Sequence, residues 1–265
     1  MVDYHLHTSR CGHAQGNPAA YLAVAVEKGL SEIGFADHFP LELLGFTPQE
    51  PVTMQAAELD AYVNEIKQLQ KQADIAVKLA VEVDYFPGKE SRTKDVLSTY
   101  EFDYIIGSVH YLDDWDFTHP ALQKRFDEVN IDEIYQQYFT LIQQLALSGI
   151  FDVVGHLDVI KKFSYFPRHD WSFLVEETCR ILKKADICVE VNTSGWRAPV
   201  KEVYPGVFFL SKCQEMNIPV TLGSDAHRPQ EVASGFQWAK LILSKLGFKE
   251  IATFSARKRT MRPLL

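Results

Sequence analysis

Short apolar segments alternate with longer amphipathic segments along this chain of 265 residues, and that alternation restricts its fold more than any other feature. The short segments are rich in β-branched and aromatic residues, which favour strands. We predict strands near Val2–Leu6, Glu32–Ala36, Ala76–Val83, Tyr104–Ser108, Asp152–Gly155, Ile187–Val191 and Pro219–Leu222. Alternation repeated seven times implies parallel strands joined by right-handed crossovers. A closed (β/α) barrel, or a distorted barrel of seven strands, fits this pattern better than an open sheet.

The amphipathic segments carry helix signals. Asn17 and Pro18 form an N-cap and a first helical position, and Gly29 ends that helix. Further helices are predicted over residues 55–72, 131–147, 173–184, 207–216 and 232–246. Residues 39–53 and 112–126 are predicted as loops, the first of them over the mouth of the barrel. Because no linker, repeat or low-complexity tract interrupts the chain, we predict a single domain over residues 1–265.

Composition and charge narrow the classes of function. Hydrophobic residues make up 46% of the chain and charged residues 23%, as in soluble globular enzymes. A net charge of -8 disfavours nucleic acid as a partner, because its phosphate backbone selects clustered Lys and Arg. The sequence shows neither a leader nor an apolar run long enough to cross a membrane. We therefore expect a cytoplasmic protein with no membrane partner.

Seven of the nine histidines lie at or just after the ends of predicted strands. They are His5, His7, His13, His38, His110, His156 and His227, and the acids Asp37, Glu82, Asp84, Asp158 and Asp225 accompany them. A single histidine in such a position is usually a hydrogen-bonded structural residue. In a parallel barrel, however, the C-terminal ends of the strands converge on one face. Seven histidines there indicate one shared site.

The spacing of these donors favours metal ions. His5 and His7 are two residues apart on an extended strand, so both imidazoles project to the same side. Glu82 ends the third strand, where its carboxylate could bridge two ions. Imidazole and carboxylate donors without a thiolate suit zinc, manganese or iron.

The number of donors also predicts the chemistry. Seven imidazoles together with Glu82 and Asp225 exceed the four donors of one tetrahedral zinc, so we predict two or three ions. Clustered divalent ions generate hydroxide near neutral pH and stabilise charge on a phosphoryl group. The site therefore predicts hydrolysis of a phosphate ester.

Six short motifs resemble those of the polymerase-and-histidinol-phosphatase (PHP) superfamily, and their order is most similar to its histidinol-phosphatase branch. The motifs are Asp3-Tyr4-His5-Leu6-His7-Thr8, Ala36-Asp37-His38, Glu82-Val83-Asp84, Gly107-Ser108-Val109-His110, Gly155-His156-Leu157-Asp158 and Gly223-Ser224-Asp225-Ala226-His227. The resemblance extends from residue 2 to about residue 240 and shows no departure at an expected metal position.

The resemblance implies a distorted, TIM-like (β/α)7 barrel with three divalent ions, whose identity as zinc, manganese or iron stays open. It implies one ion held by His5, His7, Glu82 and Asp225, a second bridged by Glu82 to His110 and His156, and a third held by His13, His38 and His227. It further implies hydrolysis of L-histidinol phosphate to L-histidinol and phosphate in histidine biosynthesis, with a metal-bound hydroxide as the nucleophile. Either Asp225 or His227 would protonate the leaving alkoxide.

The same branch suggests where the phosphate binds. The segment from Glu190 to Arg197 is similar to the family's phosphate-binding segment, and Arg197 offers a guanidinium fork that matches a phosphate. Lys161 and Lys162 are weaker candidates for the same role. Ser108, in the motif before His110, is a further candidate for substrate contact.

An acidic and aromatic segment that follows His110 is the candidate for recognising the rest of the substrate. Asp114 and Asp116 would pair with the substrate's ammonium group, and Trp115 would pack on its imidazole ring. An acidic loop around a core tryptophan is an equally good interpretation of this segment.

Other functions stay open at this point. A nuclease or nucleotide phosphatase of the same superfamily needs a basic or stacking surface, which a chain of charge -8 offers poorly. A phosphotyrosine-protein phosphatase of similar architecture is a second alternative. A non-catalytic metal-binding barrel is a third, although such a site would be expected to have lost some donors. The sequence leaves the oligomeric state open, a homo-oligomer included.

Overall fold

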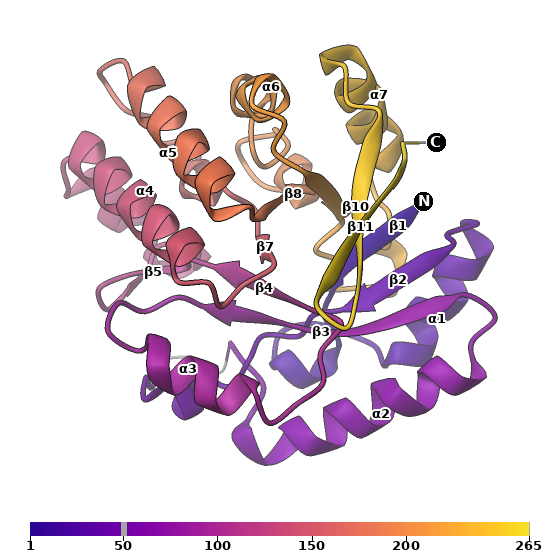
Figure 1. Cartoon of the computed structure of the whole chain (residues 1–265). Coiled ribbons are helices and arrows are strands. Elements are labelled where there is room, and N and C mark those ends of the chain that lie inside the picture. The colour runs from indigo at the N-terminus through magenta and orange to yellow at the C-terminus, as the bar shows by residue number, and fades with distance from the viewer. Residues whose placement is uncertain (49–51, 265) are drawn as a thin grey trace.

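The computed structural model describes residues 1–48 and 52–264. Seven parallel strands form one curved sheet in the order β1-β2-β3-β4-β7-β8-β9 (Figure 1). The strands are β1 (Val2–Leu6), β2 (Glu32–Phe35), β3 (Ala76–Asp84), β4 (Tyr104–Ser108), β7 (Val153–Val154), β8 (Cys188–Asn192) and β9 (Val220–Gly223). Leu6 forms a parallel bridge with Ala226, just beyond β9, and so brings the two edge strands together. The fold is a nearly closed, distorted (β/α)7 barrel, as predicted.

Helices surround the strands on the outside of the barrel (Figure 1). They are α1 (Pro18–Glu27), α2 (Leu59–Gln72), α3 (Glu90–Leu97), α4 (Ile131–Leu147), α5 (Ser172–Ala185), α6 (Val207–Glu215) and α7 (Phe236–Leu246). The predicted cap is confirmed, since the Asn17 side chain accepts a hydrogen bond from the backbone N–H of Ala20 at 3.0 Å. The sequence did not predict α3, which is short and buries only Thr93 and Leu97.

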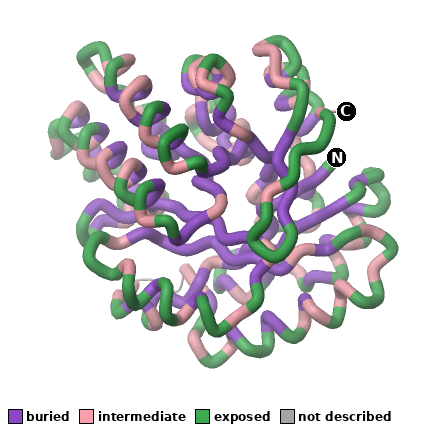
Figure 2. The backbone as a smooth tube through the Cα atoms, viewed as in Figure 1, coloured by how far each residue is buried: buried purple, intermediate pink, exposed green. Residues whose placement is uncertain are grey.

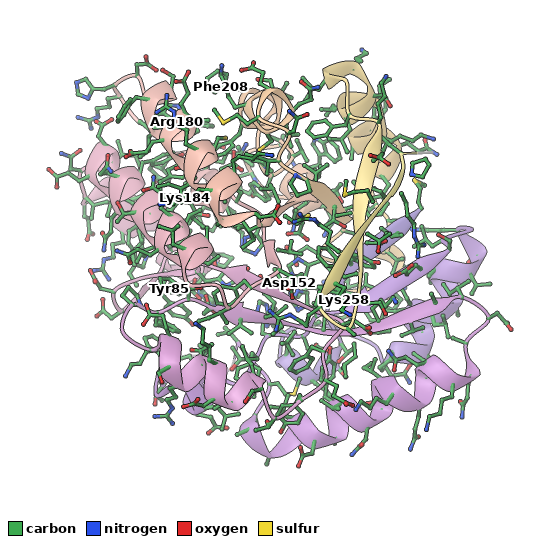
Figure 3. The ribbon with its side chains drawn as sticks, in the orientation of Figure 1. Tyr85, Asp152, Arg180, Lys184, Phe208 and Lys258 are labelled. Carbon is green, nitrogen blue, oxygen red and sulfur yellow. The ribbon has the colours of Figure 1, made fainter. Side chains whose placement is uncertain are left out.

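The strands are buried along most of their length, while the outer helix faces are exposed (Figure 2). This explains why the strands appear as continuous apolar runs and not as alternating ones, since helices cover a parallel sheet. Helix α5 has the expected amphipathic pattern. Arg180 and Lys184 point away from the barrel on its outer side (Figure 3), whereas Val175 and Leu182 are buried.

The two segments predicted as loops contain short elements. Residues 112–126 overlap a small hairpin, β5 (Tyr111–Leu112) and β6 (Trp115–Asp116), and the start of a 3-10 helix over Pro120–Asp127. Residues 39–53 contain a 3-10 helix at Leu41–Leu44. Residues 49–51 of that second segment lie outside the described residues. In the part of the chain that is described, no helix combines the length and the apolar character needed to span a bilayer.

A C-terminal hairpin, β10 (Glu250–Ser255) with β11 (Lys258–Pro263), was not predicted. It packs beside β1 and β9. The hydroxyl of Thr221 donates to the carbonyl of Ala252 at 2.9 Å, and the backbone N–H of Phe254 donates to the hydroxyl of Tyr4 at 3.2 Å. The hairpin therefore belongs to the same packed unit as the barrel.

We predict that Gly34→Ala lowers the free energy of unfolding by about 2 to 3 kcal/mol. Gly34 lies in β2, and a Cβ atom there would overlap the hydroxyl of Tyr104, which is fully buried and donates to the carbonyl of Tyr4. Adding Tyr104→Phe should recover part of the loss, because the overlapping oxygen is then absent. Urea unfolding of both single variants and the double variant measures the effect. A Gly34→Ala protein as stable as its parent would contradict this close approach.

Candidate metal centre

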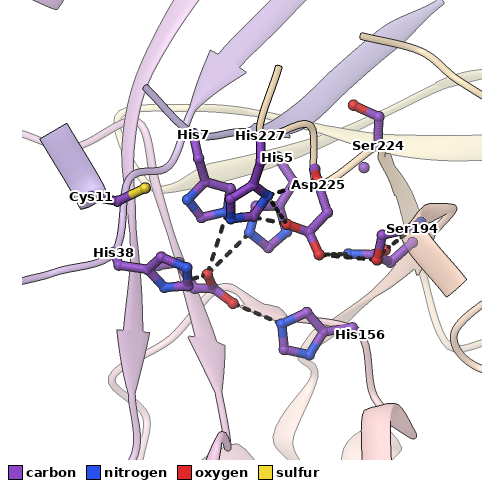
Figure 4. Close-up of polar contacts among 12 residues, drawn as sticks. His5, His7, Cys11, His38, His156, Ser194, Ser224, Asp225 and His227 are labelled. Atoms are coloured by element: carbon purple, nitrogen blue, oxygen red, sulfur yellow. Dashed lines mark hydrogen bonds and ion pairs between the residues drawn. The ribbon is translucent and has the colours of Figure 1, made fainter. Parts of the chain in front are cut away.

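The structure brings the predicted metal ligands together at the C-terminal ends of the strands (Figure 4). His5 lies on strand β1, and His7 directly follows that strand. Glu82 lies near the end of β3. The other ligands are on the loops that follow strands, namely His13, His38, His110, His156, Asp225 and His227. A cleft of about 490 Å³ opens above them. His5 and His7 are completely buried beneath it.

An inner group of donors surrounds one point. His5 Nε2 lies 3.3 Å from Glu82 Oε2, and His7 Nε2 lies 3.2 Å from Asp225 Oδ1 and 3.6 Å from Glu82 Oε2. Two donors bound at about 2.1 Å to a tetrahedral zinc are about 3.4 Å apart. The separations therefore suit ligands of a common ion, and they join the four residues that the resemblance implied for one ion.

Glu82 also faces a second group through its other oxygen. Its Oε1 lies 2.8 Å from His156 Nε2 and 3.7 Å from His110 Nε2, and these two nitrogens are 3.2 Å apart. The buried hydroxyl of Ser108 donates to the same oxygen at 2.5 Å. One carboxylate thus separates two sets of imidazoles, which is the arrangement a bridging ligand requires.

The third group of predicted ligands, His13, His38 and His227, is more widely spaced. The ring centroids of His13 and His227 are 4.7 Å apart, and those of His13 and His38 are 5.2 Å apart. His38 also approaches the inner group, with Nδ1 3.0 Å from Glu82 Oε2. The thiol of Cys11 lies with His13 and His227 in a set whose donor atoms are all within 4.8 Å of one another. This sulfur was not among the predicted ligands, and burial raises the pKa of Cys11 to about 12.

Acidic and carbonyl groups behind the histidines fix their orientation. His5 Nδ1 donates to Glu190 Oε1 at 2.6 Å, and His110 Nδ1 donates to Asp84 Oδ1 at 2.9 Å. With Nδ1 engaged in this way, Nε2 presents its lone pair to the centre, as metal-binding histidines do. Glu190 also accepts the backbone N–H of His156 at 2.8 Å. Sequence reasoning missed this role, and the signal was a carboxylate in the middle of the buried strand β8.

Asp225 is held from two sides. Its Oδ1 faces His7, whereas its Oδ2 accepts hydrogen bonds from Ser194 Oγ at 3.0 Å and Asn192 Nδ2 at 3.3 Å (Figure 4). Asp225 adopts a φ of 52°, which aims the carboxylate back towards β1. Ser194 and Asn192 belong to the segment predicted to bind phosphate, but their contact with Asp225 was not predicted.

The histidines of the centre differ in pKa. Burial lowers the pKa of His5 and His110, but Glu190 and Asp84 outweigh it, so the pKa of His5 lies well above its ordinary value and that of His110 is about 9. A bound metal ion would displace these protons.

Burial, reinforced by His227 and His38, holds the pKa of His7 well below its ordinary value, and burial also lowers the pKa of His13 to about 3. Both rings are therefore neutral and keep a free lone pair. Burial alone would raise the pKa of Glu82, but the nearby imidazoles, His5 above all, outweigh it and hold that pKa well below its usual range.

Several buried donor atoms have no hydrogen-bond partner among the residues described. They are His5 Nε2, both ring nitrogens of His7, Glu82 Oε2 and His156 Nδ1. Buried polar atoms are rarely left unpaired, because each costs about 1 to 3 kcal/mol. Most of these atoms point at the centre, so the chemistry of the donor set fits divalent cations.

Arg197 lines the cleft next to this centre. Its Nη2 donates to the carbonyls of Ser224 at 2.8 Å and Asp225 at 2.9 Å, and its Nη1 is buried with no partner within the described ranges. The guanidinium is therefore fixed in place and retains a free donor. That geometry can bind an anion.

The two neighbouring lysines lie in different places. Lys161, the predicted substrate contact, is 2% exposed and pairs with Asp158 and Glu202, both at 2.9 Å, so it does not line the cleft. Lys162 lines the cleft instead, and its Nζ donates to the carbonyl of Thr118 at 2.8 Å. Residues one apart on a helical turn face different directions, which the sequence interpretation did not take into account.

The segment after His110 divides in a similar way. Asp116 lines both the main cleft and an adjoining pocket of about 200 Å³. Asp114 lines only the smaller pocket and is 3.5 Å from Arg125. Trp115 is a core residue that packs on Phe126 at 4.6 Å between ring centroids. Ser108 is also buried, beneath Glu82, so neither of these two side chains reaches the cleft.

Comparison with known proteins agrees with this geometry. The model of the PHP domain matches residues 3–194. A protein of Deinococcus radiodurans called "Probable histidinol-phosphatase" is 36% identical over 264 residues, which cover 99% of this chain and 96% of that protein. The "Histidinol-phosphatase" of Bacillus subtilis is 28% identical, and the alignment covers 89% of this chain and 96% of that protein.

A solved structure shares the fold. Histidinol phosphate phosphatase of Lactococcus lactis, in complex with zinc, L-histidinol and phosphate, superposes with a TM-score of 0.84 and 23% identity over 98% of both chains. The family match extends from the first strand to the segment after β8, and it includes seven of the nine donors at the centre. This chain belongs to the PHP domain family.

Proposed function

We propose that this chain is a histidinol-phosphatase, which hydrolyses L-histidinol phosphate to L-histidinol and phosphate. The observation that carries the proposal is a cluster of imidazoles and carboxylates suited to divalent ions, placed beside the free donor of Arg197 in one cleft. Curated relatives with this activity in their names align over nearly the whole chain. Assay of the purified protein against L-histidinol phosphate and a panel of phosphomonoesters tests it.

Divalent ions supply the hydrolytic chemistry when bound, because they generate hydroxide near neutral pH and offset charge at phosphorus. We assign His5, His7, Glu82 and Asp225 to one ion, Glu82 with His110 and His156 to a second, and His13, His38 and His227 to a third. Zinc in the Lactococcus lactis structure supports zinc here, with manganese and iron as alternatives. Glu190 and Asp84 orient their histidines and keep the donor nitrogens aimed at the centre.

The chain's own residues hold the substrate in this proposal. Arg197 Nη1 would donate to the phosphate, and Lys162, which lines the same cleft, would add positive charge. Asp225 and His227 line the same cleft and are the pair from which the leaving alkoxide would take its proton. Asp116 would receive the substrate's ammonium group. Its Oδ1 already accepts both hydrogen bonds from Thr118, which fixes the carboxylate in position.

The remaining properties are proposals of the same kind. We propose that residues 1–265 form one PHP-type phosphohydrolase domain, and the packing of the C-terminal hairpin on β1 and β9 supports this. The partner is a small phosphorylated substrate, not nucleic acid or a membrane. Cytoplasmic localisation and a homo-oligomeric state stay predictions.

We predict that Glu82→Gln loses more than one divalent ion per chain and nearly all phosphatase activity. A neutral amide cannot balance the charge of two dications, and Glu82 separates two sets of imidazoles. Elemental analysis after metal-replete expression measures the content. Glu27→Gln, an exposed change on α1, is the matched control and should leave metal content and turnover unaltered. Full metal content in Glu82→Gln would remove the bridging role.

We predict that Arg197→Ala lowers kcat/KM by about a hundredfold on L-histidinol phosphate and on small phosphomonoesters alike. A charge-assisted hydrogen bond is worth roughly 2 to 3 kcal/mol, and both substrates carry the same dianion. Arg197→Lys should recover only part, because an ammonium has no second nitrogen for the phosphate while the first donates to the carbonyls of Ser224 and Asp225.

Metal content must be measured for the Arg197 variants, because Asp225 is a proposed ligand. The hydrogen bonds that are lost go to the carbonyls of Ser224 and of Asp225 itself. Arg180→Ala, on the exposed side of α5, is the control and should leave the kinetics unchanged (Figure 3). Unchanged kinetics in a metal-replete Arg197→Ala enzyme would exclude the phosphate contact.

We predict that Asp116→Asn raises KM for L-histidinol phosphate about tenfold while it leaves small phosphomonoesters without an ammonium group nearly unaffected. The amide keeps the shape of the side chain but loses the charge. Steady-state kinetics with both substrate types measure the ratio, and the exposed Asp95→Asn on α3 is the control. An equal loss on both substrates would instead place Asp116 in the hydrolytic machinery.

A further inference from the structure

Tyr204 is a buried tyrosine whose hydroxyl has no hydrogen-bond partner in the described part of the protein. The residue is 1% exposed, and it lines the main cleft. Other buried tyrosines are satisfied by carbonyl groups, as Tyr62 is by Phe35 and Tyr138 is by Leu157, both at 2.9 Å. Tyrosine hydroxyls usually find a partner when buried, so the unpaired hydroxyl of Tyr204 requires an explanation.

The position of Tyr204 is fixed by its backbone and its ring. Its N–H and carbonyl pair with the carbonyl and N–H of Asn192 at 2.9 and 2.7 Å, which attaches it to the end of β8. Its ring lies against Gly195, where a Cβ atom would be 3.0 Å from the ring carbons Cε2 and Cζ. Lys161 Nζ lies 5.6 Å from the ring centroid on another side. The hydroxyl therefore cannot swing away to find another partner.

The lining of this cleft is rich in unused donors. Arg197 Nη1 is buried and unpaired within the described residues, as the Tyr204 hydroxyl is, and Lys162 uses only one hydrogen bond of its ammonium, to Thr118. Burial raises the pKa of Tyr204 above its ordinary value, so the phenol stays protonated and acts as a donor. Donors collected in this way match a ligand with several acceptor oxygens and a negative charge.

We propose that Tyr204 binds the phosphate group of the substrate, with its hydroxyl donating to a non-bridging phosphate oxygen beside Arg197. This inference rests on the proposed function, because it assigns the cleft to a phosphate ester. Two segments would then form the phosphate subsite. One carries Arg197 after β8, and the other carries Tyr204, which forms an antiparallel bridge with Asn192.

The test compares the metal-loaded wild type with Tyr204→Phe, which keeps the ring and removes only the hydroxyl. Product inhibition by inorganic phosphate should weaken by about ten- to a hundredfold, the range for a hydrogen bond to a charged acceptor. Inhibition by L-histidinol should stay the same, because that product has no phosphate. The fold-change in phosphate inhibition between the two proteins should be the same from about pH 6 to 9, since a protonated phenol does not titrate there.

Tyr135→Phe is the matched control. Its hydroxyl is equally buried and donates to the carbonyl of Tyr165 at 2.7 Å, outside the cleft. It should reduce thermal stability slightly and leave phosphate inhibition unchanged. Metal content and melting temperature are recorded for both variants, so that a folding defect is recognised. If Tyr204→Phe weakens phosphate and L-histidinol equally, or changes neither, the hydroxyl does not bind phosphate and the proposal is overturned.

Calorimetric titration of inorganic phosphate into both metal-loaded proteins separates this proposal from the function it rests on. A weaker phosphate affinity in Tyr204→Phe supports the contact even if L-histidinol phosphate proves a poor substrate. Equal affinities overturn the contact even if L-histidinol phosphate is the best substrate found.

Discussion

The site depends on a buried carboxylate that lies between two sets of imidazoles. Glu82 has its two oxygens directed at different histidines, His5 with Oε2 and His156 with Oε1, and almost none of it is exposed. A carboxylate in such a place is costly to ionise unless positive charge surrounds it. The barrel provides this by gathering on one face the histidines that lie on or follow β1, β2, β4, β7 and β9. The barrel fold therefore creates the environment in which Glu82 can remain ionised.

Acidic side chains behind the proposed metal ligands fix the orientation of the residues around the centre. Glu190 and Asp84 accept hydrogen bonds from ring nitrogens, whereas Asp3 accepts the backbone N–H groups of Ser224 and Ala233, both at 2.8 Å. Gly223 has no side chain because a Cβ atom there would overlap the Glu190 carboxylate. These groups contribute no ligand in the assignment we propose. Glu190 and Asp84 determine which nitrogen of His5 and of His110 points inward.

The sequence predicted the barrel and the convergence of the histidines, because both follow from short-range patterns. Strand positions come from apolar runs, and the ends of parallel strands share one face. Side chains on irregular segments were harder to predict. Lys161 and Lys162 are adjacent in sequence, yet only Lys162 lines the cleft, and Trp115 belongs to the core. The contact of Glu190 with His5 and the place of Tyr204 in the cleft were not predicted, because both depend on contacts with distant segments, which no local pattern encodes.

The bridge between Leu6 and Ala226 joins the first and last strands of the barrel, and it has a consequence for how the protein is made. His5 and His7 are synthesised long before Asp225 and His227, because the two pairs are far apart in the sequence. A polypeptide that has not yet reached Asp225 consequently lacks part of the proposed ligand set. The full set of proposed ligands forms only when β1 and β9 come together, so full metal content would report that the barrel has closed.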